Sequence, residues 1–256
     1  MDSGNNLAFV TYFNDYEINW IPEFIHYHLV VGVEHFYFYY MQEDPSIGNK
    51  LLKPYTDKGV VTLTHLPTKN VYNRWRESYA LARSNAINEY NWLGFIDTDE
   101  FVLPRAKDTI PEILEDYKQH DGLTINWRCF SPLEQTPKSQ LKEIIYYKKN
   151  LNKHVKCIVK PSKIEKFYNS HDIHCLRVNE NYRRVTGAYN NPPTGEKIRI
   201  NHYVIRSKEE FYQIDKRLNP RKNQKYYDRA AGGTLIDTEI WDRFGDKVEK
   251  IKKSFC

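Results

Sequence analysis

Residues 92–101 read Trp-Leu-Gly-Phe-Ile-Asp-Thr-Asp-Glu-Phe, an apolar run that leads directly into clustered acids. The first five residues are typical of a strand that is buried on both faces of a sheet. Asp97, Asp99 and Glu100 follow within four positions, and carboxylates this close repel one another unless a cation neutralises them. Mg²⁺ and Mn²⁺ prefer such oxygen ligands and keep coordination places for phosphate. The alternative is that Asp97 caps the next segment while the other acids face water.

Strand and helix signals alternate through the first hundred residues. Four apolar runs predict strands, at residues 7–13, 33–41, 60–66 and 92–96. Three segments with helical spacing separate these strands, at residues 18–32, 47–59 and 74–90. This order predicts an α/β fold with a mostly parallel, Rossmann-like sheet. Ligands of such sheets bind beyond the carboxyl ends of the strands, which is where the acidic stretch lies.

The second half of the chain has a less regular pattern. We expect strands at residues 122–130, 154–161 and 197–206. We expect helices at residues 108–120, 207–218 and 235–253. The segments 131–153 and 162–195 read as loops rich in polar residues. Because no flexible linker separates the halves, we predict a single domain over residues 1–256.

Composition and charge exclude several classes of protein. No run of about 18 apolar residues exists, so no membrane span is predicted, and the N-terminus does not resemble a signal peptide. The four cysteines form no CxxC pair, which argues against structural zinc. We therefore expect a soluble, cytoplasmic protein with free thiols. Residues 1–100 carry 7 Lys or Arg and 13 Asp or Glu, whereas the whole chain has a net charge of +5. The basic second half could meet phosphates, an anionic membrane or nucleic acid, or could simply face water.

Several motifs in this order resemble the GT-A glycosyltransferases, specifically family 92, the DUF23-like group related to glycosyltransferase family 2. The matching text is FNDYEINWIPEFIHYHLVVGVEHFYFYY at 13–40, LLKPYTDKGVVTL at 51–63 and WLGFIDTDEFVLP at 92–104. The segments NWRCFSP, HVKCIVKP and INHYVIRSKEEF resemble the second half of the group. Two departures are Asn14-Asp15 in place of Asn-Glu, and Phe24 in place of Trp.

The resemblance implies a GT-A fold and an activity. Residues 1–105 would bind the nucleotide sugar, and residues 106–256 would form an irregular acceptor-binding half. The reaction would be a metal-dependent, inverting transfer of a hexosyl or pentosyl group to a hydroxyl of a glycan, on an oligosaccharide or glycoprotein. A UDP-sugar donor is favoured, with a leaning toward UDP-galactose, and Mn²⁺ or Mg²⁺ is the expected cofactor. We expect no nucleic-acid partner.

The same resemblance implies roles for individual residues. Asp97, Asp99 and His202 would bind the metal, with ribose contact as the alternative role of Asp97, and Glu100 would brace its neighbours. Residues expected at the nucleotide and its phosphates are Thr11, Tyr12, Asn14, Asp44, Arg74, Asp97 and Lys156. Lys156 would neutralise the departing diphosphate.

Inversion requires a general base that removes the proton of the acceptor hydroxyl. Asp172 and Glu134 are the candidates, because each follows a strand-like segment in a loop. His171 and His174 flank Asp172, and we assign them to acceptor or phosphate contacts. Ordinary polar loop residues are the alternative interpretation for all four.

Two other functions compete with glycosyl transfer. A nucleotidyltransferase could use a similar α/β scaffold, but the stretch TYFNDYEIN after the first strand lacks the Gly-rich, basic signature of that class. A non-enzymatic module that binds nucleic acid or another anion could use RLNPRKNQKYYDR at 217–229, which mixes basic and aromatic residues. The acidic first half argues against a phosphate backbone as its ligand.

Overall fold

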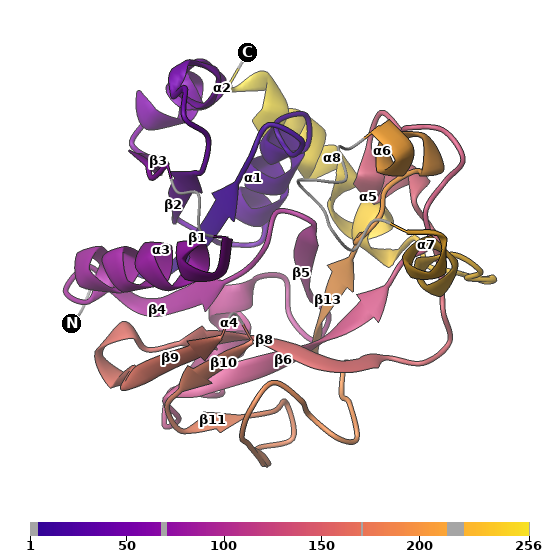
Figure 1. Ribbon diagram of the computed structural model, residues 1–256. Coiled ribbons are helices and arrows are strands. Elements are labelled where there is room, and N and C mark those ends of the chain that lie inside the picture. Colours follow the sequence, from indigo (N-terminus) through magenta and orange to yellow (C-terminus); the bar gives the residue numbers. More distant parts are fainter. Residues whose placement is uncertain (1–4, 68–70, 170, 214–222, 256) are drawn as a thin grey trace.

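The computed structural model describes residues 5–67, 71–169, 171–213 and 223–255 (Figure 1). Four parallel strands form the first part of a ten-stranded sheet, in the order β3-β2-β1-β4. They are β1 (Asn5–Phe13), β2 (His35–Tyr40), β3 (Val61–His65) and β4 (Tyr90–Phe95). Three crossover helices connect them: α1 (Ile21–Val30), α2 (Ser46–Thr56) and α3 (Val71–Ala86). All seven elements agree with the prediction from the sequence.

Strands of the second half extend this sheet. The order continues from β4 through β8 (Asn152–Val159), β6 (Gly122–Cys129), β11 (Arg177–Val178) and β12 (Arg184–Val185). β13 (Ile198–His202) pairs in parallel with β6 and antiparallel with β5 (Glu100–Pro104). Every antiparallel pair of this sheet includes a strand from residue 100 onward. The predicted α/β class with a mostly parallel central sheet is therefore confirmed.

Apolar side chains cover both faces of the sheet. On one face, α3 packs Tyr79, Ala82 and Ala86 against a cluster that includes Val10 and Phe95. On the other face, α1 and α8 (Glu239–Lys253) share a larger core, and the two helices contact each other. Figure 1 shows α8 running beside α1. Burial on both sides explains why the strands read as continuous apolar runs.

Several short elements differ from the expectation for the second half. The segment 131–153 contains α5 (Gln140–Glu143) and β7 (Tyr146–Tyr147), and β7 pairs with β14 (Leu235–Ile236). The segment 162–195 contains a 3-10 turn (Pro161–Lys163) at its start, and then β9 (Lys166–Asn169), β10 (Asp172–His174), β11 and β12. These segments are therefore not purely loops. The remaining helices are α4 (Ile110–Glu115), α6 (Lys208–Gln213) and α7 (Gln224–Ala230).

A buried histidine attaches α1 to β5. His28 donates from Nδ1 to the carbonyl oxygen of Phe24 at 2.9 Å and accepts at Nε2 from the backbone N–H of Val102 at 3.1 Å. Its ring stacks on Phe101, with the centroids 5.5 Å apart. Burial lowers the pKa of His28 to about 3, so the ring is neutral at neutral pH. Both ring nitrogens of His28 therefore have hydrogen-bond partners, and these two bonds connect β5 to α1.

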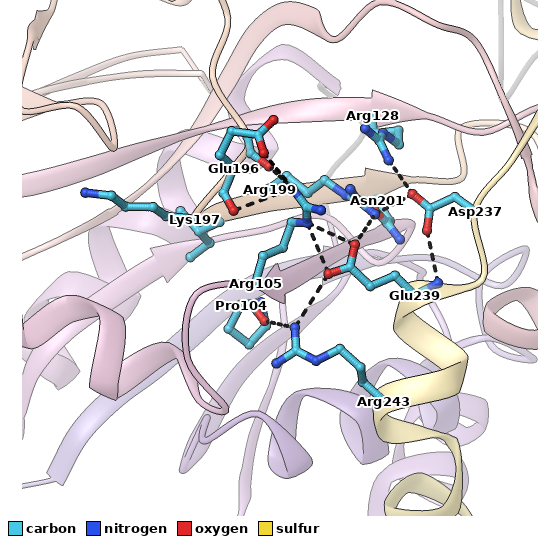
Figure 2. A network of polar contacts seen from close by, with 12 residues as sticks. Pro104, Arg105, Arg128, Glu196, Lys197, Arg199, Asn201, Asp237, Glu239 and Arg243 are labelled. Carbon is cyan, nitrogen blue, oxygen red and sulfur yellow. Dashed lines mark hydrogen bonds and ion pairs between the residues drawn. The ribbon is translucent and has the colours of Figure 1, made fainter.

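Charged side chains fasten the start of α8 to the sheet (Figure 2). Arg199 is fully buried, and its guanidinium contacts Asp237 at 2.5 Å and Glu239 at 3.3 Å. Arg128 shares Asp237, while Arg105 binds Glu239 at 2.9 Å. Buried charges are tolerated when they are paired in this way. Some of the arginines that make the second half basic therefore form ion pairs inside the protein and do not contribute to a solvated basic surface.

Candidate metal and nucleotide site

The acids of the opening stretch lie in the tight turn between β4 and β5. The backbone N–H of Glu100 donates to the carbonyl oxygen of Asp97 at 3.0 Å, and the Glu100 carboxylate accepts from the backbone N–H of Asp97 at 2.9 Å. These two bonds fold residues 97–100 onto themselves. Glu100 is fully buried, and Asp97 and Asp99 are half-buried. The turn therefore presents its acids at the carboxyl end of β4, where ligands of α/β sheets bind.

His202 joins this turn because β13 pairs with β5. In the antiparallel register His202 lies opposite Glu100. Its Nε2 is 3.4 Å from Oδ2 of Asp99. Asp99, Glu100 and His202 each offer one ligand atom, and these atoms lie within 4.8 Å of one another. A strand pairing across about one hundred residues thus builds a possible metal site.

The donor set fits a divalent cation. Oε1 of Glu100 and Oδ1 of Asp97 are buried, and neither has a hydrogen-bond partner among the described residues. Such orphaned oxygens are costly unless a cation or water satisfies them. Two carboxylates with one imidazole suit Mn²⁺ or a similar ion, whereas Mg²⁺ is better matched by oxygen ligands alone.

Asp99, Glu100 and His202 strongly influence one another's protonation. Burial opposes ionisation of Asp99, but His202 overrides this effect and lowers the pKa of Asp99 well below its usual range. Burial likewise opposes protonation of His202, and Asp99 then raises the pKa of His202 well above its usual value. Burial raises the pKa of Glu100 to about 8. Without a metal, a proton on His202 therefore balances the charge of Asp99 and the raised pKa of Glu100 favours its neutral, protonated form, and a bound cation would displace both protons.

Asp97, predicted as a metal ligand, contacts a cation of the protein itself. Nζ of the fully buried Lys156 lies 2.7 Å from Oδ2 of Asp97 and 3.7 Å from Oε2 of Glu100. Desolvation disfavours a charged lysine here, but Asp97 and Glu100 outweigh it and raise the pKa of Lys156. Tyr12 lies close enough to Asp97 that this carboxylate, together with burial, raises the pKa of its phenol. Lys156 and Tyr12, both predicted at the site, are thus next to the acidic turn.

Two residues that the sequence analysis did not select also belong to this region. Glu17 accepts hydrogen bonds from the Thr98 hydroxyl and from the backbone N–H of Asn14, the latter at 3.0 Å. Burial raises the pKa of Glu17 to about 7. The positive charge of Arg206 offsets part of this rise, and together with His202 it favours the ionised form of Asp99. In the sequence, Glu17 stands three positions after Asn14, and this nearby acid was the available signal. The Asn-Glu motif of the family pointed to Asp15 instead.

Other predicted nucleotide contacts have varied surroundings. Thr11 is buried on β1, and its hydroxyl has no hydrogen-bond partner among the described residues. Asn14 accepts at Oδ1 from the backbone N–H of Tyr16 at 2.9 Å. Asp44 is exposed and accepts from the backbone N–H and hydroxyl of Ser46, the first residue of α2, so its described hydrogen bonds are local. Arg74 lies on α3, and its side chain is outside the described part.

The two candidate bases are paired with cations. Asp172 on β10 accepts from the buried Arg177 at 2.6 Å. Glu134 is exposed and pairs with Lys208 at 3.1 Å. His171 donates from Nδ1 to the carbonyl oxygen of Val155 at 3.1 Å, and burial lowers its pKa to about 4. His174 is exposed and pairs with Glu165 at 2.7 Å.

No curated protein matches the chain. Among solved structures, it is similar to 4-diphosphocytidyl-2C-methyl-D-erythritol synthase from Anaerococcus prevotii DSM 20548, with 9% identity, a TM-score of 0.41, and coverage of 72% of this chain and 92% of that one. A second structure of 4-diphosphocytidyl-2C-methyl-D-erythritol synthase has 9% identity, a TM-score of 0.41, and coverage of 73% and 94%.

The sequence pattern of a known enzyme family, by contrast, extends over most of the chain. The model of glycosyltransferase family 92 matches residues 10–231. This range includes the acidic turn, Lys156 and His202, so the match spans every residue of the possible metal site. The chain therefore belongs to glycosyltransferase family 92 and is a glycosyltransferase.

Proposed function

We propose that this glycosyltransferase is metal-dependent and inverting, and that it moves a hexosyl or pentosyl group from a nucleotide-diphosphate sugar to a glycan hydroxyl. The single observation that carries the proposal is the convergence of Asp99, Glu100 and His202 within 4.8 Å at the carboxyl end of β4. Membership of glycosyltransferase family 92 supports a nucleotide-sugar donor and a glycan acceptor. UDP-sugars are the favoured donors, with UDP-galactose first. Residues 1–105 form the donor half in this proposal, and residues 106–256 the acceptor half.

The acidic and basic residues of the site would have different roles in the reaction. Asp99, Glu100 and His202 would hold Mn²⁺ or Mg²⁺, and the cation, when bound, would neutralise the diphosphate of the donor. Lys156 fixes one oxygen of Asp97 through its 2.7 Å ion pair, and the second oxygen, which has no hydrogen-bond partner among the described residues, would contact the metal or the ribose. Arg206 adds positive charge beside Asp99. Thr11 and Tyr12 lie near the end of β1, Asn14 follows the strand, and the three would line the base and ribose.

Proton removal from the acceptor needs a base on the acceptor side. We retain Asp172 as the candidate, because the buried Arg177 holds its carboxylate in one orientation. Glu134 is the second candidate, although its exposed pair with Lys208 gives it no comparable positioning. Asp172→Asn should abolish transfer to the acceptor while nucleotide binding persists. Equal turnover of Asp172→Asn and wild type would exclude this role.

A thermal-shift and hydrolysis screen of nucleotide sugars tests the function directly. UDP- and GDP-sugars are incubated with the protein in Mn²⁺, in Mg²⁺ and in EDTA. One nucleotide class should raise Tm in the presence of metal and not in EDTA, and the matching sugar nucleotide should be hydrolysed slowly. If no sugar nucleotide stabilises the protein or is consumed, the proposed function is wrong.

Binding of nucleic acid or another anion is the competing proposal, carried by the basic residues of segment 217–229, of which 223–229 is described. Salt-sensitive binding of oligonucleotides, together with no response to UDP or GDP in Mn²⁺, would favour it.

The described part contains no helix that is long and apolar enough to cross a membrane.

A further inference from the structure

A row of aromatic rings leads away from the possible metal site. His202 contacts Trp127 with ring centroids 4.4 Å apart. Trp127 stacks on His154 at 5.2 Å with nearly parallel planes, and His154 contacts Tyr189 at 4.6 Å. His171 joins the row from the side, 5.2 Å from Trp127 and 5.6 Å from His154. Four rings thus form a continuous path from the metal site to the surface.

Burial changes steadily along this row. Trp127 is 8% exposed, His154 and His171 are half-buried, and Tyr189 is 57% exposed. A tyrosine that keeps more than half of its surface in water gains little from folding. Aromatic rings with one apolar face and a polar edge suit contact with partly apolar ligands. Tyr189, at the outer end of the row, is therefore available to a ligand, and the buried Trp127 supports the row from inside.

The protein holds the outer rings in place. The residues on either side of Tyr189 bond to β8, since Val155 donates to the carbonyl oxygen of Ala188 at 3.1 Å and Asn190 donates to that of Lys153 at 2.9 Å. A buried amide strengthens this attachment, because the side chain of Asn190 donates to Oδ1 of Asn126 at 2.8 Å. The exposed ring of Tyr189 is thus carried by backbone that is fixed on both sides.

His154 is also oriented by the sheet. Its Nδ1 donates to Oδ1 of Asn152 at 2.8 Å, and its backbone N–H donates to the same oxygen at 3.0 Å. Because Nδ1 carries the proton, Nε2 is left as the acceptor nitrogen of the ring. Rigid aromatic surfaces bind ligands at a low cost in conformational entropy. Both outer rings meet this condition.

We propose that Tyr189 and His154 form a stacking platform for an uncharged sugar ring of the glycan acceptor, in which Tyr189 supplies the stacking face and His154, tilted by 56° to it, supplies a polar edge. Sugar rings have an apolar C–H face that lies on aromatic rings and hydroxyls at the edge that bond to groups such as Nε2 of His154. The identification of this sugar as part of the acceptor rests on the proposed function. In the proposed division of the chain both residues belong to the acceptor half, and the row of rings connects them to His202, so a sugar that stacks here would lie along the row that leads to the proposed metal site.

Binding of methyl glycosides, measured by saturation-transfer NMR without any donor, tests the platform independently of turnover. The probes are the methyl glycosides of galactose, glucose, N-acetylglucosamine and glucuronic acid. Wild type should give signals from at least one neutral glycoside and weaker signals from the glucuronide. Tyr189→Ala should weaken the binding of that glycoside by about threefold to tenfold. Tyr189→Phe should retain it, and so should Tyr168→Ala, which removes another exposed tyrosine of this half.

The two proposals fail in different ways. Equal glycoside binding by wild type, Tyr189→Ala and His154→Ala, or no binding by wild type, overturns the platform even where a donor is hydrolysed. Tyr189-dependent glycoside binding without hydrolysis or binding of any sugar nucleotide leaves the platform and overturns the proposed donor. Where wild type transfers sugar, Tyr189→Ala should raise the acceptor KM and leave the KM and hydrolysis rate of the donor unchanged.

Discussion

His202 lies directly opposite Glu100 in the antiparallel pairing of β5 and β13, and its Nε2 is 3.4 Å from Asp99. This one register joins the acidic turn of the first half to a histidine of the second half. Since side chains alternate along a strand, a slip of one residue would move His202 to the other face of the sheet. The site therefore depends on the strand pairing as much as on its ligands.

Asp99→Asn tests the metal site. The amide retains the shape of the side chain and removes one charge, so metal-dependent stabilisation by UDP should disappear and transfer should fall by at least about hundredfold. The measurement is Tm with Mn²⁺ and UDP, and turnover of the donor found in the screen. Asp57→Asn is the control, because Asp57 is exposed, pairs with Lys53 and is not among the residues expected at the site. Wild-type behaviour of Asp99→Asn would remove Asp99 from the metal site.

Lys156→Met tests the buried cation. Asp97 and Glu100 would lose the charge that lies 2.7 Å and 3.7 Å from them, and breaking a buried pair costs about 3–5 kcal/mol of unfolding free energy. Mn²⁺ should recover part of this loss, so the gain in Tm on adding Mn²⁺ should exceed that of wild type. Lys53→Met, which breaks an exposed pair with Asp57, should change stability by less than about 1 kcal/mol. Similar losses in both variants would contradict the structural importance of Lys156.

Much of the first half could be predicted from the sequence because its signals are local. Each parallel strand is a short apolar run, and the helices between them carry their own periodicity. The acidic turn after β4 was visible for the same reason, since strand and acids are adjacent in the chain. His202 was identified only through resemblance to the family, and the structure brings it to Asp99.

The features that could not be predicted from the sequence depend on residues that are far apart in the chain. β5 begins within the acidic turn, and nothing near Glu100 indicates that β13 will pair with it. Glu17 reads as a loop acid until Thr98, 81 positions later, donates to it. Asp237 likewise reads as part of a helix, although it binds Arg128 and Arg199. Pairing over such distances leaves no periodic trace in one sequence.

His26→Phe tests a pH dependence. Burial, with Lys252, lowers the pKa of His26 to about 4, below its ordinary 6.5. The unfolded chain therefore binds more protons below pH 6.5, and the stability contributed by neutral His26 is lost as the pH falls toward 4. Between pH 7 and pH 5 this amounts to about 2 kcal/mol. The stability difference between wild type and His26→Phe should shift by this amount in urea titrations.

The difference between the two proteins is the proper measure, because Glu17 and Glu100 have raised pKa values and act in the opposite direction. Tyr55→Phe is the matched control. It removes the hydroxyl that lies 2.9 Å from Nε2 of His26 and keeps the buried imidazole, so the pH dependence should persist. A shift of the same size in Tyr55→Phe and His26→Phe would assign the effect to the hydrogen bond rather than to burial of the ring.

Asp237→Asn tests the charge network at the start of α8. Asp237 accepts from Arg199 and Arg128, and the first of these is fully buried (Figure 2). Removing one carboxylate leaves two guanidinium groups with less compensation, which should cost about 3–5 kcal/mol of unfolding free energy. The measurement is urea denaturation at neutral pH.

Asp246→Asn is the control for this experiment, because it removes an exposed carboxylate from α8 itself. Its effect should stay within about 0.5 kcal/mol. A second variant, Arg128→Met in the Asp237→Asn background, should recover part of the lost stability, since it removes one of the two cations that Asp237 balances. If Asp237→Asn is as stable as Asp246→Asn, the attachment of α8 rests on apolar packing against α1 rather than on these charges.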